Sequence, residues 1–191
     1  GLTIASWAVW VQLWRTGRAA GETLKQALDG VARPGPWPRV PLDKLLFPFL
    51  PGRRGVKRTR DIVFADRDGE PLRLDVYEPR ESTARRPAVI QVHGGAWVIG
   101  DKREQGLPLL NHLAANGWVG FNINYRLSPA ATFPDHLVDV KAAIAWVREH
   151  ADRYGVDPNF VAVTGGSAGG HLAALAALTS DDRRYQPGFE G

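Results

Sequence analysis

The sequence contains no cysteine and no methionine among its 191 residues. Without cysteine the chain can form no disulfide, no thiolate nucleophile and no cysteine-ligated metal site. A cysteine-free protein can reside in a reducing or an oxidising compartment, so a cytoplasmic and a membrane-associated location both stay open. A translated chain starts with Met, whereas this one starts with Gly1, which predicts a processed or trimmed piece. Its 44% hydrophobic and 23% charged content is typical of one globular domain.

Charged side chains are absent from the first 14 residues, which are rich in tryptophan. Ile4, Trp7, Val11 and Trp14 recur at helical spacing, which predicts a helical segment within residues 1–30. Tryptophan followed by arginine is typical of the headgroup level of a membrane, so this segment is a candidate membrane-proximal region. Fourteen residues are too few to span a bilayer, which takes about 20. The alternative is a helix that packs on the domain or caps its pocket.

Positive charge is concentrated in residues 1–58, which carry a net charge of +7 against −3 for the remainder. This distribution favours a solvated basic linker or attraction to an anionic membrane surface. No nucleic-acid partner is expected, because no recognition motif accompanies the charge. Proline and arginine recur through residues 31–58, which predicts an irregular linker. The folded domain is therefore expected over residues 59–191.

Strands and helices alternate along this domain. Strands are expected at 61–64, 72–77, 88–92, 118–125 and 160–163, the first two forming a hairpin around Asp68-Gly69 and the last being short and buried. Helices are expected at 102–116, at 134–150 and after Ser167. The alternation predicts an α/β fold, with a mostly parallel sheet covered by helices on both faces.

A G-x-S-x-G motif, Gly165-Gly166-Ser167-Ala168-Gly169, lies between the last expected strand and its helix, where a nucleophile elbow is found. In such a turn the serine is strained, and side chains two positions before and after it would collide with the backbone. The positive end of the following helix favours the anionic charge that develops during acyl transfer. A dinucleotide loop is excluded, because Ser167 stands where G-x-G-x-x-G needs its second glycine. Ser167 is the predicted nucleophile.

A second motif, His93-Gly94-Gly95-Ala96-Trp97, directly follows the expected strand at 88–92. The N–H groups of Gly94 and Gly95, joined by that of Ala168, are predicted to form an oxyanion hole, in which each donor contributes about 2.7–4 kcal/mol. His93 is expected to tie the loop down by hydrogen bonds and not to act as the base. Trp97 is expected to border the substrate pocket, with core packing as the alternative. A phosphate-binding loop is excluded, because Asp101-Lys102 replaces the required Lys-Ser/Thr.

Together the two motifs resemble the hormone-sensitive-lipase-like and feruloyl-esterase-like branch of the α/β-hydrolases. The resemblance covers roughly residues 59–191 and extends to Gly100-Asp101-Lys102, Asn124-Tyr125-Arg126-Leu127, Phe133-Pro134, Asp139-Val140-Lys141-Ala142-Ala143-Ile144 and Tyr154-Gly155-Val156-Asp157-Pro158. It implies the α/β-hydrolase fold and the hydrolysis of small-molecule carboxylic esters through an acyl-serine intermediate, with no cofactor and no metal. Relatives with His-Gly-Gly-x-Trp include arylformamidases, so an amide substrate such as N-formylkynurenine is an alternative.

The chain departs from this branch in its catalytic triad, which runs Ser, then Asp or Glu, then His. The only histidine after Ser167 is His171, one turn along the same helix, so it cannot face the hydroxyl and is expected to pack that helix. His112, His136 and His150 are expected to be surface or capping residues. The base and its acid are therefore expected beyond Gly191. The piece alone is predicted to be inactive, with an open sheet edge at 160–163; an inactive remnant or binding module is the alternative.

Overall fold

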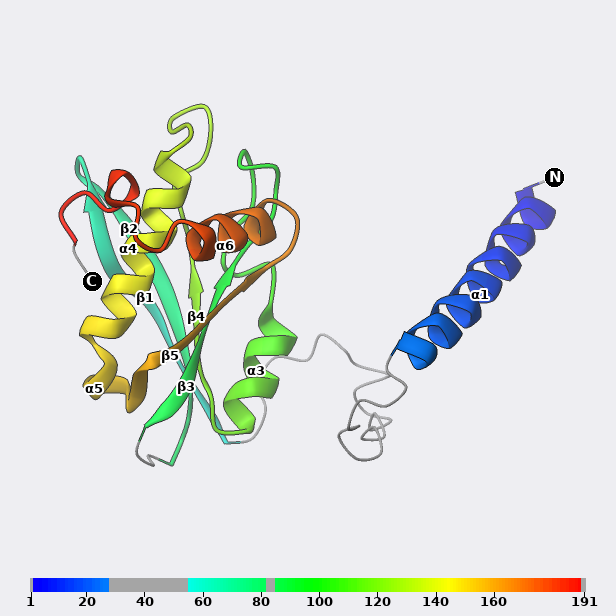
Figure 1. Cartoon of the computed structure of the whole chain (residues 1–191), viewed down its shortest axis with the longest axis horizontal. Helices are drawn as coiled ribbons and strands as arrows, with labels where there is room; N and C mark the ends of the chain where they lie inside the picture. The colour runs from blue at the N-terminus through cyan, green and yellow to red at the C-terminus, as the bar shows by residue number, and fades with distance from the viewer. Residues whose placement is uncertain (1, 28–54, 82–84, 190–191) are drawn as a thin grey trace. The chain divides into compact units, whose positions relative to one another are not determined.

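A computed structural model of the chain describes residues 2–27, 55–81 and 85–189 (Figure 1). The chain divides into two units, one that contains helix α1 (Leu2–Ala27) and one that contains every other described element. Residues 31–54 of the predicted linker lie outside the described residues.

Helix α1 is 26 residues long and lies within residues 1–30, where a helical segment was expected. Trp7, Val11 and Trp14 are exposed on it, with 74%, 44% and 59% of their surfaces accessible. The Arg18 guanidinium lies over the Trp14 ring, 4.8 Å from its centroid. Among the described segments, no helix combines the length and the apolar character needed to cross a bilayer.

The second unit is built on a five-stranded sheet in the order β1-β2-β4-β3-β5. The strands are β1 (Val56–Arg67), β2 (Glu70–Pro79), β3 (Arg86–Val92), β4 (Val119–Ile123) and β5 (Val156–Gly165). Strand β2 is antiparallel to β1 and β4, whereas β3 is parallel to β4 and β5. Four strands thus share one direction, which confirms a mostly parallel sheet with a hairpin at its N-terminal edge.

Helices cover both faces of this sheet (Figure 1). Side chains alternate between the two faces of a strand. On β3, Ile90 belongs to the large core cluster that also contains residues of α4 (Asp135–Glu149), α5 (Ala151–Tyr154) and α6 (Ala168–Leu178). Its neighbour Val89 packs on the opposite face against α3 (Leu107–Ala115). A short 3₁₀ helix, Arg183–Tyr185, follows α6.

Helix α3 begins five residues later than predicted. Gly106, which precedes it, has a left-handed φ of 75°, and a proline lies in its first turn. Proline is favoured at a helix start, where its missing N–H costs no hydrogen bond. Residues 102–105 instead form turns that lead from the loop after β3 into the helix.

The strand predicted at 160–163 is present within β5, and its open edge was expected as well, but its residues are not buried. Phe160 is 53% exposed and Ala162 is exposed as well. Strand β5 is an edge strand, because only β3 pairs with it among the described strands. An apolar run shows that a segment suits a sheet, but it does not show how many neighbours the strand has. The pairing of β3 with β5 is regular from Ala88–Val161 to Val92–Gly165.

Candidate active site

The two predicted motifs meet at one end of the sheet. Strands β3 and β5 are parallel neighbours, and their last residues, Val92 and Gly165, are paired in register. The loop of residues 93–100, here called the oxyanion loop, leaves β3 at this level, and the elbow of residues 165–169 leaves β5 beside it. The carboxyl ends of parallel strands are the usual location of binding sites in open α/β sheets.

The elbow has the strained geometry expected of a nucleophile turn. Ser167 has φ 52° and ψ −123°, a left-handed conformation that costs a residue with a side chain of order 1–3 kcal/mol. A Cβ atom at Gly165 would lie 2.5 Å from the Gly169 carbonyl carbon, and one at Gly169 would lie 2.2 Å from Val92 O. A Cβ atom at Gly166 would meet nothing within 4 Å. The steric reason predicted for glycine at 165 and 169 is therefore confirmed.

The oxyanion loop touches the elbow directly. Gly94 is buried, and a Cβ atom added to it would lie 2.7 Å from Gly166 O and 3.3 Å from Ser167 Cβ. Ser167 itself is exposed, and its hydroxyl has no hydrogen-bond partner in the described part of the chain. The backbone of the loop and the serine are thus close enough to act on one substrate carbonyl.

Gly94 is bound by side chains on both of its polar groups. Its N–H donates to Gln105 Oε1 at 2.8 Å, and its carbonyl lies 2.8 Å from His93 Nδ1. Within residues 85–189, the N–H groups of Gly95 and Ala168 donate to no other residue. Two of the three predicted oxyanion donors are therefore unpaired and the third is engaged. No sequence motif signalled the contact with Gln105, which lies 11 residues further along the chain.

His93 lies in the position of an anchor and not of a base. Its side chain is fully buried and stacks on the Tyr125 ring, with centroids 4.4 Å apart. The Tyr125 hydroxyl donates to the His93 carbonyl at 3.1 Å. Burial raises the pKa of Tyr125, so the phenol keeps the proton that it donates. Because a carbonyl only accepts, Nδ1 of His93 must carry the hydrogen that binds Gly94.

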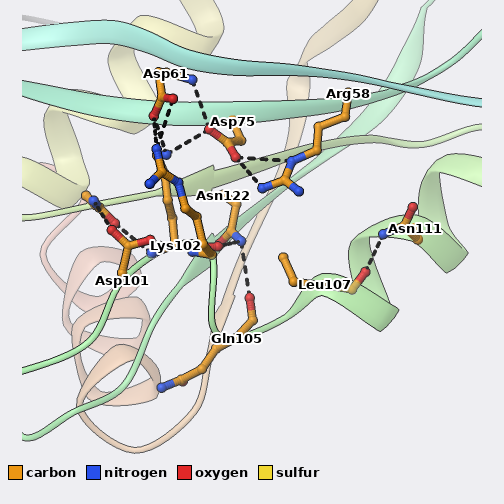
Figure 2. A network of polar contacts seen from close by, with 11 residues as sticks. Arg58, Asp61, Asp75, Asp101, Lys102, Gln105, Leu107, Asn111 and Asn122 are labelled. Atoms are coloured by element: carbon orange, nitrogen blue, oxygen red, sulfur yellow. Dashed lines mark hydrogen bonds and ion pairs between the residues drawn. The ribbon is translucent and has the colours of Figure 1, made fainter. Parts of the chain in front are cut away.

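A buried ionic cluster holds the segment that follows the oxyanion loop (Figure 2). Lys102 is 1% exposed, and its Nζ lies 2.7 Å from Asp61 Oδ1 and 2.8 Å from Asp75 Oδ1. Arg58 adds a contact of 2.6 Å to Asp75 Oδ2. Burial alone would raise the pKa of Asp75, but hydrogen bonds from Lys102, the Asp61 N–H and Arg58 outweigh it and lower that pKa. The cluster ties the segment to strands β1 and β2.

Two asparagines bind the same segment to the end of β4. Asn124 Oδ1 accepts from the Lys102 N–H at 2.7 Å, and its Nδ2 donates to Asp101 at 2.9 Å. The fully buried Asn122 donates to the carbonyls of Lys102 and Gln105, the latter at 3.1 Å (Figure 2). The sequence indicated a strand here and, from Asn124 onward, part of the family resemblance, but polar residues within an apolar run do not reveal their partners.

A pocket of about 370 Å³ is lined by residues of the oxyanion loop, of segment 128–136 and of α6, the helix that follows the elbow. Trp97 lines it, as predicted, and also packs against the core cluster, so both alternatives for this residue apply. His171 was expected to pack the helix but is exposed, with its ring edge-to-face to Trp97 at 5.3 Å. The remaining lining residues are Ala96, Ser128, Thr132, Phe133, His136 and Leu172.

The prediction that His136 is a surface or capping residue is wrong. It is 4% exposed, its Nε2 lies 3.5 Å from Ser128 Oγ, and its ring meets Tyr125 edge-on. Burial lowers its pKa in spite of Asp139 and Asp135. His150 caps α4 as predicted, with Nδ1 2.9 Å from the Trp146 carbonyl. Nowhere in the described ranges do three His, Asp or Glu side chains gather to hold a metal ion.

The model of the BD-FAE family matches residues 74–190, which include the oxyanion loop, the elbow and the pocket. The chain belongs to the BD-FAE family. Among curated proteins, this BD-FAE chain is 53% identical over 124 residues to a probable carboxylic ester hydrolase, LipM, and 43% identical over 166 residues to esterase LipC, both of Mycobacterium tuberculosis. The matches cover 64% and 84% of this chain but 29% and 40% of those proteins. The chain thus spans about a third of the length of these relatives.

Solved structures of esterases share the BD-FAE chain's fold. Native esterase 2 of the planctomycete Thermogutta terrifontis aligns with a TM-score of 0.58 at 35% identity, covering 64% of this chain and 44% of that one. The same enzyme phosphorylated by paraoxon aligns with a TM-score of 0.58, covering 66% and 48%. These findings confirm the α/β-hydrolase fold and the resemblance to its esterase branch.

Proposed function

We propose that the protein is a serine carboxylic ester hydrolase and that Ser167 is its nucleophile. The observation that carries this proposal is the geometry around Ser167. The serine is held in a left-handed conformation at the start of α6, against Gly94 and beside the unpaired N–H groups of Gly95 and Ala168. The esterases among its relatives support the same chemistry.

The reaction is acyl transfer through the serine. A general base takes the proton of Ser167 Oγ, and the oxygen attacks the ester carbonyl. The N–H groups of Gly95 and Ala168 stabilise the tetrahedral oxyanion, and that of Gly94 does so only if Gln105 releases it. The alcohol leaves with the proton held by the base. Water then attacks the acyl-serine and releases the acid.

The base and its acidic partner come, in this proposal, from outside the described residues and beyond residue 191. Each nearby imidazole is otherwise engaged. His93 binds Gly94, His171 packs on Trp97 from the helix that follows Ser167, and His136 is buried against Ser128 and Tyr125. The acid is expected to hold the base in the orientation that accepts the proton of Ser167.

The pocket beside Trp97 is proposed to take the acyl or alcohol part of a small-molecule ester. Its volume, about 370 Å³, lies within the usual range for small-ligand pockets. Trp97 and Phe133 supply flat apolar walls, and the His171 ring borders them. This composition favours short-chain or aryl groups.

The test compares nitrophenyl esters of increasing chain length as substrates of the full-length protein. Ser167→Ala is expected to lower kcat by a factor on the order of 10⁶, because the covalent route is lost. Ser180→Ala changes an exposed serine beyond the end of α6 and is expected to keep full activity. Retained activity in Ser167→Ala would falsify the assignment. Parallel assays on N-formyl aryl amides distinguish an esterase from an arylformamidase.

Helix α1 is proposed to attach the protein to an anionic membrane surface. Exposed Trp7 and Trp14 supply apolar anchors, and Arg15 and Arg18 are exposed cations on the same helix. Such a helix lies in the interface, and each basic residue near anionic lipid contributes about 1 kcal/mol. The full-length protein is expected to float with phosphatidylserine vesicles and to lose this binding when Trp7 and Trp14 are replaced by Ala. Equal recovery of wild type and variant in the lipid fraction contradicts the idea.

A further inference from the structure

Gln105 contacts the oxyanion loop from the segment that precedes α3. Its Oε1 accepts the Gly94 N–H at 2.8 Å and lies 3.4 Å from the position of a Cβ atom at Gly94. The other polar group of Gly94, its carbonyl, is bound by His93. One glycine is therefore clamped between two side chains that approach it from different elements.

The clamp sets the direction of the next N–H group. A trans peptide is planar, so the Gly95 N–H points opposite to the Gly94 carbonyl. The hydrogen bond from His93 to the Gly94 carbonyl therefore also fixes the direction of the Gly95 N–H. The preceding peptide plane is fixed by the bond from the Gly94 N–H to Gln105. Without these two hydrogen bonds the peptide planes on either side of Gly94 could rotate relative to each other, because glycine has access to most backbone conformations.

Gln105 is itself held rigidly enough to serve as a reference point. Its carbonyl accepts from Asn122 Nδ2 at 3.1 Å, and the same amide binds the carbonyl of Lys102 (Figure 2). Asn122 is fully buried in β4, and Lys102 is fixed by Asp61 and Asp75. The orientation of the Gln105 amide is unambiguous, because only its oxygen can accept from an N–H.

We propose that Gln105 is a positioning residue for the oxyanion hole, which orients Gly94 so that the N–H of Gly95 faces the oxyanion beside Ser167. Gln105 does not touch the substrate in this arrangement and acts through the backbone of the loop. The inference rests on the proposed esterase function. It also assigns Gly95 and Ala168 as the oxyanion donors and gives Gly94 a structural role in place of the predicted one.

The opposite possibility gives the opposite result. If the Gly94 N–H were a donor to the oxyanion, Gln105 would compete with the substrate for it, and removing the amide would raise kcat. If Gln105 orients the loop, removing the amide lowers kcat. The sign of the change therefore decides between the two.

The experiment uses Gln105→Met in the full-length protein, since methionine keeps the length of the side chain and removes the strong acceptor. We expect kcat to fall about tenfold or more, below the 10²–10³-fold loss typical of a missing donor, with KM changed by less than about twofold. Affinity for a trifluoromethyl ketone, which forms a tetrahedral adduct with the serine, is expected to fall by the same factor as kcat.

Asn111→Met is the matched control (Figure 2). Asn111 Nδ2 donates to the Leu107 carbonyl at 2.8 Å, so this variant also deletes an amide bond to backbone, but within α3 and away from Gly94. Its kcat and ketone affinity are expected to match the wild type. Gln105→Asn keeps the amide but is one methylene shorter, so its kcat is expected to fall less than that of Gln105→Met. This variant provides the test if Gln105→Met does not fold.

Three outcomes overturn the inference: unchanged kcat and ketone affinity, an increase in kcat, or equal losses in Gln105→Met and Asn111→Met. Failure here is distinguishable from failure of the proposed function. If the wild type hydrolyses esters, depends on Ser167 and tolerates the loss of the Gln105 amide, only the positioning role is wrong. If no ester is hydrolysed by the wild type, the proposed function itself is wrong.

Discussion

Both arms of the site are closely packed, and the oxyanion loop is held in addition by side-chain hydrogen bonds. The elbow after β5 is fixed by close contact, since Gly165 and Gly169 leave no room for a single additional carbon. The oxyanion loop after β3 is also closely packed, since a Cβ atom at Gly94 would lie 2.7 Å from Gly166 O and one at Gly95 would lie 1.9 Å from Ile99 O. In addition, the side chains of His93 and Gln105 form hydrogen bonds with Gly94. An element fixed by contact fails when one atom is added, whereas an element held by several bonds loses its position in steps. An added atom is thus expected to be costly in either arm, whereas the loop can also be weakened in steps by removing the side chains that bind it.

The largest effect is expected from adding a methyl group to the elbow. In Gly169→Ala the new Cβ would lie 2.2 Å from Val92 O and 2.7 Å from His93 O, so β3 and α6 must separate. We expect a loss of about 3 kcal/mol or more in the free energy of unfolding, at the upper end for overpacked sites, together with loss of activity. Urea unfolding and ester hydrolysis by the full-length protein measure both.

Gly166→Ala adds the same methyl group in the same turn, where nothing lies within 4 Å of it. Its unfolding free energy is expected to stay within about 0.5 kcal/mol of the wild type. Equal tolerance at 166 and 169 would show that contact does not fix the elbow.

A smaller effect is expected from removing the lysine that anchors the loop segment. Lys102→Met leaves the buried Asp75 with Arg58 and the Asp61 N–H as partners, so part of its compensation remains. We expect a loss of about 2 kcal/mol in unfolding free energy, below the 3–5 kcal/mol typical of a buried charge left alone, and a partial drop in kcat.

Lys57→Met removes an ion pair of the same type from the exposed side of the hairpin, where Lys57 lies 2.7 Å from Glu78. Little change is expected, because exposed ion pairs contribute little to stability. If the two lysine variants unfold at the same urea concentration, the buried cluster is not an anchor.

The smallest effect expected is on the pH dependence of stability, and it concerns the side of the oxyanion loop. His136 packs against Tyr125, which itself contacts His93 of that loop. Burial lowers the pKa of His136, so the unfolded chain binds a proton at a higher pH than the folded one. Stability contributed by the neutral ring is full above the ordinary pKa, about 6.5, and is lost as the pH falls through it towards the folded value. His136→Phe is therefore expected to lose less stability than the wild type between about pH 7 and about pH 5. Parallel losses in urea titrations at the two pH values would refute this.

The elbow could be predicted from the sequence because its geometry is local. Five consecutive residues specify the turn, and a Cβ atom at Gly165 would collide within it, with the Gly169 carbonyl, whereas one at Gly169 would collide with the end of β3. The hairpin around Asp68-Gly69 is local for the same reason. The oxyanion loop was only half predicted, since His93 acts on its neighbour but Gln105 acts from 11 residues away with no motif between them.

Features that depend on neighbours in space were missed. His136 was taken for a surface residue because it lies near the start of a helix, yet that turn packs on Tyr125. Residues 160–163 were expected to be buried because they are apolar, although the open sheet edge predicted there already implied exposure, and Phe160 is 53% exposed on that edge.

The pairing of Val92 with Gly165 has a further consequence for catalysis. Each residue advances a strand by about 3.3 Å, so slipping β5 by one position against β3 would carry Ser167 that far from the donors on the loop. The slip would also turn every β5 side chain to the opposite face. Useful N–H···O distances span only about 0.5 Å. The hydrogen-bond register between these two strands therefore sets the distance between Ser167 and the N–H donors of the loop. Mutations that weaken the pairing of β3 with β5 are therefore expected to lower activity, even at Ala88 or Val161, which pair at the other end of the regular register.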